Sequence, residues 1–304
     1  MGARRGNVTL RLLLVLAAIA VCWAAPPGRA EEPGPAKHFL WKVTGGKGTA
    51  YLFGTIHVGN AELYPLSAVI EDSFKQSDQL VEEIDLSTGD PEAAAQQMIE
   101  AGLYPPGDSL DKHLGETTRA ELAAYAKSAG LPEFYTRVKP WLVSVLVLQL
   151  QLKQLGLDKA EGLDLHFSEE AKAADKPVAA LETADKQLRL FSSLSDDLQE
   201  KLLLATLLDA KKAEEMLKET LAAWRDGDAA GMERVITEDE RTHPALVPLT
   251  HKLLDERNEA MARKVDEFLR TPKTYFVAVG AAHMVGPHGI IALLRDRGYA
   301  IEQE

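Results

Sequence analysis

Two histidines follow the same local pattern near opposite ends of the chain. The apolar run 51–53 leads into a Gly-x-x-His at 54–57, and the run 275–279 leads into a second copy at 280–283. Each run predicts a buried strand, and its glycine permits a tight turn that leaves the histidine at the strand's C-terminal edge. Ligands usually bind at that edge of open α/β sheets, and imidazole is both a common metal ligand and a general base. If the two strands are close together in the fold, His57 and His283 face one cleft.

A carboxylate in an apolar segment is the next candidate. Glu83 lies within residues 79–86, which we predict to form a strand, and an unpaired carboxylate would be costly to bury there. Side chains alternate along a strand, so Glu82 is expected on the opposite face, with one of the two exposed. Glu83 would complete a metal site of two histidines and one carboxylate, or act as a general base.

Further polar residues follow other predicted elements. Glu182 directly follows the short predicted strand 177–181. It is either a second candidate carboxylate for the site or an ordinary acid at the start of the next helix. Asp164 reads as an N-terminal acid of its helix. Arg257 and Asn258 lie on the last long helix, within reach of the site or as an ordinary surface pair. His288 is a third ligand or a bystander, and the remaining histidines have no comparable context: His38, His113, His166, His243 and His251.

The elements that must position these residues give an α+β fold. A hairpin is expected at 39–53, and strands at 79–86, 177–181, 274–280 and 299–302. Helical patterns cover 65–77, most of 90–155, 162–175, 183–270 and 289–297, and the stretch 141–152 is apolar on nearly every face, as in a buried helix. We predict a mixed central sheet built from N- and C-terminal strands, with a large helical insertion.

Composition restricts the location and the partners. Arg4 and Arg5 precede an apolar run at 12–25 and a small-residue site near Ala30, which predicts a signal peptide at 1–30 and a domain at 31–304. The protein is then periplasmic or secreted, with no integral membrane domain in the mature chain; a lipoprotein acylated at Cys22 or an uncleaved N-terminal anchor is the weaker alternative. The net charge of −12 argues against nucleic acid as a partner. Loss of the leader removes the only cysteine, and with it disulfides and a thiol nucleophile.

Several segments together resemble one family. They are 51–57, 81–86, 139–141, 162–164, 181–183 with Gln187, 257–258 and 279–283, and they run in family order from about residue 38 to the C-terminus. The chain resembles the TraB/GumN family, which includes the Tiki metalloproteases and is related to erythromycin esterase and ChaN-like proteins. The resemblance implies that both histidines and Glu83 share one cleft. It also implies a manganese or cobalt ion, which Tiki-like members use to hydrolyse peptides.

These observations predict an exported, peptidase-like, metal-dependent hydrolase. His57, His283 and Glu83 would hold the divalent ion, and Glu83, Glu182 and Arg257 would serve catalysis. Two alternatives remain open: a metal-independent, esterase-like hydrolase, and a non-enzymatic periplasmic protein that binds a metal or haem. The partner is a peptide or a small-molecule substrate, and the oligomeric state stays open.

Overall fold

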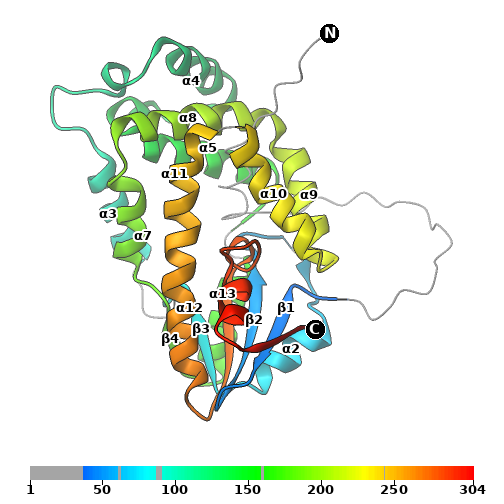
Figure 1. Ribbon diagram of the computed structural model, residues 1–304. Coiled ribbons are helices and arrows are strands. Elements are labelled where there is room, and N and C mark those ends of the chain that lie inside the picture. The colour runs from blue at the N-terminus through cyan, green and yellow to red at the C-terminus, as the bar shows by residue number, and fades with distance from the viewer. Residues whose placement is uncertain (1–36, 61–62, 87–90, 159–160, 243) are drawn as a thin grey trace, which may run out of the picture.

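A six-stranded mixed sheet is the centre of the fold. We describe a computed structural model over residues 37–60, 63–86, 91–158, 161–242 and 244–304, so the predicted signal peptide lies outside the described residues. In Figure 1 the sheet occupies the lower part of the molecule and most of the helices lie above it. The strands are β1 (Leu40–Thr44), β2 (Thr49–Thr55), β3 (Gln79–Glu82), β4 (Val178–Ala180), β5 (Thr274–Gly280) and β6 (Ala300–Gln303).

The strand order brings the two ends of the chain together. It is β4-β3-β5-β2-β1-β6, so β5 from the C-terminal end lies between β3 and β2. Strands β4, β3, β5 and β2 run parallel, whereas β1 is antiparallel to both β2 and β6. Every residue of β2 and β5 after the first is buried. Both strands are continuously apolar, so both of their faces can be covered by other parts of the protein. The predicted mixed sheet and hairpin are confirmed.

Helices cover both faces of the sheet and form the insertion above it. One face carries α2 and α6, whose Phe74 and Phe167 pack against Phe53 and Phe276 of the sheet. In Figure 1, α12 and α13 lie in front of the sheet. The helices are α2 (Ala68–Lys75), α3 (Pro91–Gly102), α4 (Glu116–Ala129), α5 (Pro140–Gln154), α6 (Leu163–Ala173), α7 (Ala184–Ser192), α8 (Asp196–Asp209), α9 (Ala213–Arg225), α10 (Ala229–Thr242), α11 (Val247–Thr250), α12 (Glu256–Leu269) and α13 (Ile290–Asp296).

The first turn of α12 carries polar side chains into the interior. Its buried residues are Arg257, Asn258, Met261, Ala262, Val265 and Leu269, which follow the helical period and form one stripe. Along most of α12 the stripe is part of the hydrophobic core. In the first turn of the helix the same stripe directs Arg257 and Asn258 inward. They are 4% and 2% exposed, so they are not a surface pair. A π-helical turn at His251–Asp255 joins α11 to α12 without a break (Figure 1).

Strand β3 is shorter than predicted. It ends at Glu82, and Glu82 and Glu83 are 2% and 8% exposed, so the expectation that one of them is exposed was wrong. Because Glu83 follows the strand, alternation no longer fixes its direction, and its carboxylate turns toward Arg257. Glu82 accepts a hydrogen bond from the backbone N–H of Leu86, and burial raises its pKa to about 7, which permits a protonated carboxyl there.

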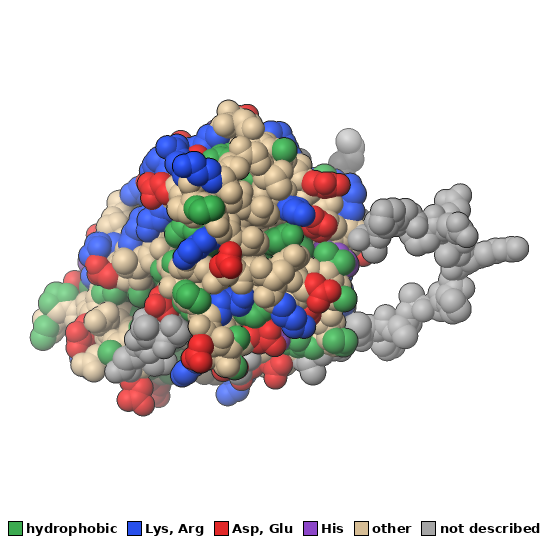
Figure 2. Space-filling model, turned by 90° about the horizontal axis from the view of Figure 1, so that it is seen from below, with side chains coloured by type: hydrophobic (Ala, Val, Ile, Leu, Met, Phe, Trp, Pro, Cys, Tyr) green, Lys and Arg blue, Asp and Glu red, His purple; other side chains and the backbone are tan. Residues whose placement is uncertain are grey.

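The surface seen from below carries charges of both signs. Figure 2 shows Lys and Arg side chains interspersed with Asp and Glu, and hydrophobic groups scattered among them. None of the helices in the described ranges is both long and apolar enough to cross a bilayer.

Candidate active site

Four parallel strands deliver polar residues to the same edge of the sheet. His57 follows β2, Glu83 follows β3, Glu182 follows β4 and His283 follows β5. Parallel pairing places Thr55 opposite Gly280, so the two Gly-x-x-His turns leave neighbouring strands at the same level. The C-terminal edge of parallel strands is where α/β proteins usually bind ligands.

The two histidines face one carboxylate oxygen. His57 Nε2 lies 3.8 Å from Glu83 Oε1, and His283 Nε2 lies 3.7 Å from the same atom. The backbone N–H of Gly280 donates to that oxygen at 2.8 Å. A Cβ at position 280 would lie 2.8 Å from His57 Nε2 and 3.1 Å from Glu83 Oε1, so glycine keeps the space between these groups open.

Each imidazole is held through its other nitrogen. His57 Nδ1 lies 2.7 Å from Asp164 Oδ2, and Thr55 donates its hydroxyl hydrogen to Asp164 Oδ1. His283 Nδ1 lies 2.6 Å from Asn258 Oδ1. Both partners are acceptors, so in the neutral imidazoles Nδ1 carries the proton and the lone pair of Nε2 faces the cleft. This arrangement is typical of histidines that bind a metal.

Arg257 connects the two buried glutamates. Its Nη2 donates to Glu83 Oε2 at 2.6 Å and its Nε donates to Glu182 Oε2 at 2.8 Å. The carbonyl of Leu253, in the π-helical turn, accepts from Nη1 at 3.0 Å. Gln187 adds a donor to Glu83 Oε2 at 3.1 Å. The remaining oxygen of Glu182 accepts from the Lys186 ammonium at 2.6 Å, so Glu182 faces two cations.

Burial and neighbouring charges fix the protonation states. Burial lowers the pKa of His57, but the carboxylates of Asp164 and Glu83 outweigh it and raise that pKa to about 9. Burial and the Arg257 guanidinium lower the pKa of His283 to about 3, so this imidazole is neutral at physiological pH. Burial opposes ionisation of Glu83, but the cationic groups around it, including Arg257, hold its pKa well below the usual value.

A buried nitrogen lacks a partner in this cleft. The side chain of His283 is 0% exposed, and its Nε2 makes no hydrogen bond with any described residue. An unpaired buried acceptor is costly, and a cation at that position would satisfy it. Two imidazole nitrogens and a carboxylate oxygen are a donor set that suits divalent transition metals. The chemistry of these donors therefore suits a divalent ion, although the three ligand atoms do not all lie within 4.8 Å of one another.

The sequence did not reveal the roles that several residues have in this site. Asp164 was expected only as an N-terminal acid of its helix, and the structure adds its contact with His57. Asn258 was expected near the site without a role, and it holds His283. Its Nδ2 donates to the backbone carbonyl of His288 at 2.9 Å, which is how His288 joins the surroundings of the site. The signal for Asn258 was its place on the apolar stripe of α12.

A pocket of about 330 Å³ lies beside this cleft. We call it the α10–α12 pocket, because α10, the π-helical turn, α12 and the loop after β5 line it. Its lining includes Glu233, Ile236, Leu254, Asn258, Ala282 and Val285. Asn258 and Ala282 thus border both the pocket and His283, so a ligand in the pocket would lie next to the residues that hold this histidine.

The sequence matches a described family and several named proteins. The model of the TraB/PrgY/gumN family matches residues 39–303. The uncharacterized protein YbaP of Escherichia coli (strain K12) is 26% identical over 278 residues, which cover 90% of this chain and 96% of that protein. Metalloprotease TIKI2 of Danio rerio is 26% identical over 87% of this chain and 60% of its own length. Metalloprotease TIKI1 of Homo sapiens is 22% identical over 87% of this chain and 61% of its own. No solved structure gives a significant match.

Proposed function

Because this chain belongs to the TraB/PrgY/gumN family, we propose that it is a metal-dependent hydrolase with a peptidase-like activity. Relatives named metalloproteases support the reaction class. The observation that carries the proposal is the unpaired Nε2 of His283, which is fully buried and faces the same Glu83 oxygen as His57 Nε2.

In this proposal His57, His283 and Glu83 hold the ion, and manganese or cobalt is the choice that the family resemblance favours. A divalent ion supplies Lewis acidity and lowers the pKa of bound water. Asp164 and Asn258 keep each Nε2 aimed at the cleft through Nδ1. The negative charge of Asp164 and Glu83, which favours a proton on His57, equally favours a cation between the imidazoles.

Glu83, Arg257 and Glu182 have different roles in this scheme. Glu83 Oε1 faces the histidines, so it is placed to bind the ion or to accept a proton from water. Arg257 keeps Glu83 ionised and oriented through Oε2. Glu182 faces Arg257 and Lys186, so we assign it as a positioning residue for Arg257 and favour Glu83 over it as the base.

A peptide is the substrate that we propose. The α10–α12 pocket combines buried apolar residues such as Ile236 and Leu254 with the acid Glu233. This lining suits a substrate side chain that has both an apolar part and a polar part. Hydrolysis would take place outside the cytoplasm, because residues 1–30 have the order of charged, apolar and small residues of a signal peptide.

The test is hydrolysis of a peptide library and of simple esters by the purified protein, after chelation and after return of manganese or cobalt. We expect peptide cleavage that requires the metal and that is lost in His57→Ala and His283→Ala. His113→Ala is the matched control for His57→Ala, because both side chains are 26% exposed and His113 lies in a different cluster.

Other outcomes would favour the alternatives. Ester cleavage that persists after chelation and requires Glu83 would indicate a metal-independent hydrolase. Metal binding that requires both histidines, without turnover of any substrate, would indicate a non-enzymatic metal-binding protein. Equal peptide cleavage in wild type and both histidine variants would overturn the proposed site.

A further inference from the structure

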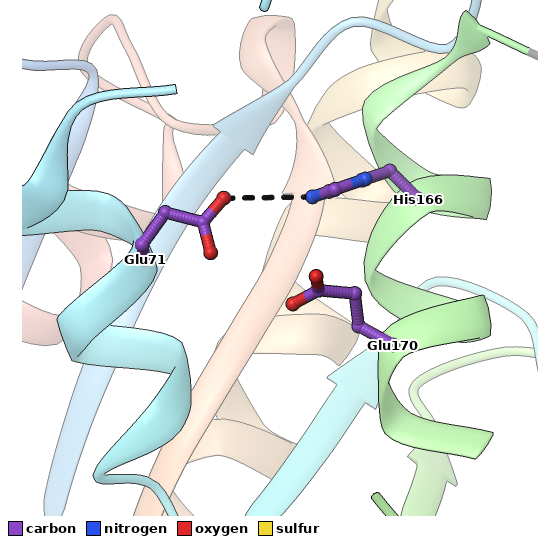
Figure 3. A group of neighbouring side chains, drawn as sticks. All are labelled: Glu71, His166 and Glu170. Atoms are coloured by element: carbon purple, nitrogen blue, oxygen red, sulfur yellow. Dashed lines mark ion pairs between the residues drawn. The ribbon is translucent and has the colours of Figure 1, made fainter. Parts of the chain in front are cut away.

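A second group of metal-ligating side chains lies outside the cleft. Glu71 comes from α2, and His166 and Glu170 come from α6, one helical turn apart. In each residue one ligand atom lies within 4.8 Å of the ligand atoms of the other two. Figure 3 shows the three side chains converging on the space between the two helices. All three residues are partly buried.

His166 has an unmet nitrogen in this group. Its Nε2 is buried and forms no hydrogen bond with the described residues, although Glu71 Oε1 lies 3.6 Å away. Ligands at about 2.1 Å from one tetrahedral ion are separated by about 3.4 Å, so this spacing suits two ligands of one ion better than a hydrogen bond.

The surroundings are negatively charged. Lys75 pairs with Glu71 Oε2 at 3.5 Å, which leaves Oε1 facing His166, and that lysine is 64% exposed. The ring of Tyr64 lies 5.1 Å from the His166 ring. The carboxylate groups of Glu71 and Glu170 lie within 4.8 Å of each other and of a ring nitrogen of His166, so a cation would be favoured at this position.

We propose that Glu71, His166 and Glu170 form a second divalent-metal site, of the zinc type, that joins α2 to α6. One imidazole and two carboxylates leave a fourth tetrahedral position for water. The site is structural: α6 also carries Asp164, which holds His57, so a metal ion that joins α6 to α2 would fix the helix that orients His57. This inference does not depend on the proposed hydrolysis.

The experiment is zinc titration of the metal-stripped protein by calorimetry, with Glu170→Gln against Glu169→Gln. These variants remove the same charge from neighbouring positions of α6, and Glu169 is exposed and outside the group. We expect Glu170→Gln to weaken zinc binding at this site by more than about tenfold, and Glu169→Gln to leave it unchanged. Saturating zinc should raise the melting temperature of wild type by about 5 °C, and that of Glu170→Gln by clearly less.

Histidine NMR separates this site from the cleft. The chain has eight histidines, so their imidazole signals can be assigned by single substitutions. Zinc should shift the ring nitrogens of His166, and His57→Ala should leave this shift in place. Equal zinc affinity in Glu170→Gln and Glu169→Gln, or an unmoved His166 signal at saturation, would show that Glu71 and His166 form only an ion pair. Zinc bound without hydrolysis would leave this site standing while the proposed function fails.

Discussion

Arg257 Nη2 lies 2.6 Å from Glu83 Oε2, although 174 positions separate the two residues in the chain. The pair joins the first turn of α12 to the end of β3, and both side chains are buried. A buried charge that loses its partner retains the cost of its desolvation. This ion pair is therefore expected to matter for the stability of the fold as well as for the site.

Arg257→Met should destabilise the protein strongly. The substitution keeps an unbranched aliphatic side chain, although a shorter one, and leaves the carboxylates of Glu83 and Glu182 without their shared cation. We expect a loss of about 3–5 kcal/mol in the free energy of unfolding. Urea unfolding measures it. Lys186→Met is the control, because it removes the partly exposed partner of Glu182 and should cost less than about 1 kcal/mol. Similar losses in the two variants would contradict this account.

Asp164→Asn should reduce activity without unfolding the protein. The amide can no longer favour a proton on His57 Nδ1 as the carboxylate does, so we expect a decrease of about 10–100-fold in peptide hydrolysis. Circular dichroism should match that of wild type. Glu169→Gln, an exposed charge on the same helix, serves as the control and should keep full activity. Unchanged rates in Asp164→Asn would exclude a role for Asp164 in orienting His57.

The two motif glycines should respond differently to alanine. Gly280→Ala puts a methyl group between His57 Nε2 and Glu83 Oε1, so hydrolysis and metal affinity should fall at least about tenfold while the fold remains. Gly54→Ala directs its methyl at 2.4 Å from Phe39 Cδ1 in the core, so its main effect should be about 1–3 kcal/mol of destabilisation. Thermal unfolding and activity assays on both variants measure this contrast. If both variants lose stability and neither loses activity, the glycine at 280 does not serve to keep the space beside His57 open.

Stability should depend on Asp266 at low pH. The hydrogen bond from the Tyr299 hydroxyl, together with Arg270, lowers the pKa of Asp266 below its usual 3.8, against the effect of burial. A pKa that is lower in the folded state than in the unfolded state stabilises the protein at pH values above the unfolded pKa. This stabilisation is lost as the pH falls through the folded pKa. Wild type should therefore exceed Asp266→Asn in unfolding free energy at pH 6, and this difference should shrink below about pH 4. A constant difference from pH 6 to pH 3 would refute the prediction.

Much of the sheet followed from local pattern. The runs 51–53 and 275–279 are continuously apolar, and such runs are stable only when both faces are covered, which placed them at the centre of a sheet. Strand β5 has the bounds predicted for it, whereas β3 ends four residues early. The predicted strand included Glu83 because a period of two does not reveal where pairing stops, and the partner strands decide this.

The residues that support the histidines were harder to predict. Asp164 and Asn258 are ordinary helix residues in the sequence, and their roles depend on contacts with residues 107 and 25 positions away. His166 had no distinguishing context, because its neighbour Glu71 lies on another helix. Local periodicity carries no information about such pairs.

The sequence by itself determined where the strands lie along the chain, apart from the end of β3, together with the helical insertion and the two Gly-x-x-His turns, because glycine and apolar periodicity act over a few residues. The tertiary structure decided that β5 pairs in parallel with β2 and β3, that both histidines face one oxygen of Glu83, and that Arg257 lies buried between Glu83 and Glu182. The physical reason is that strand order and the pairing of buried charges depend on the packing of the whole sheet against its helices, which no local segment specifies.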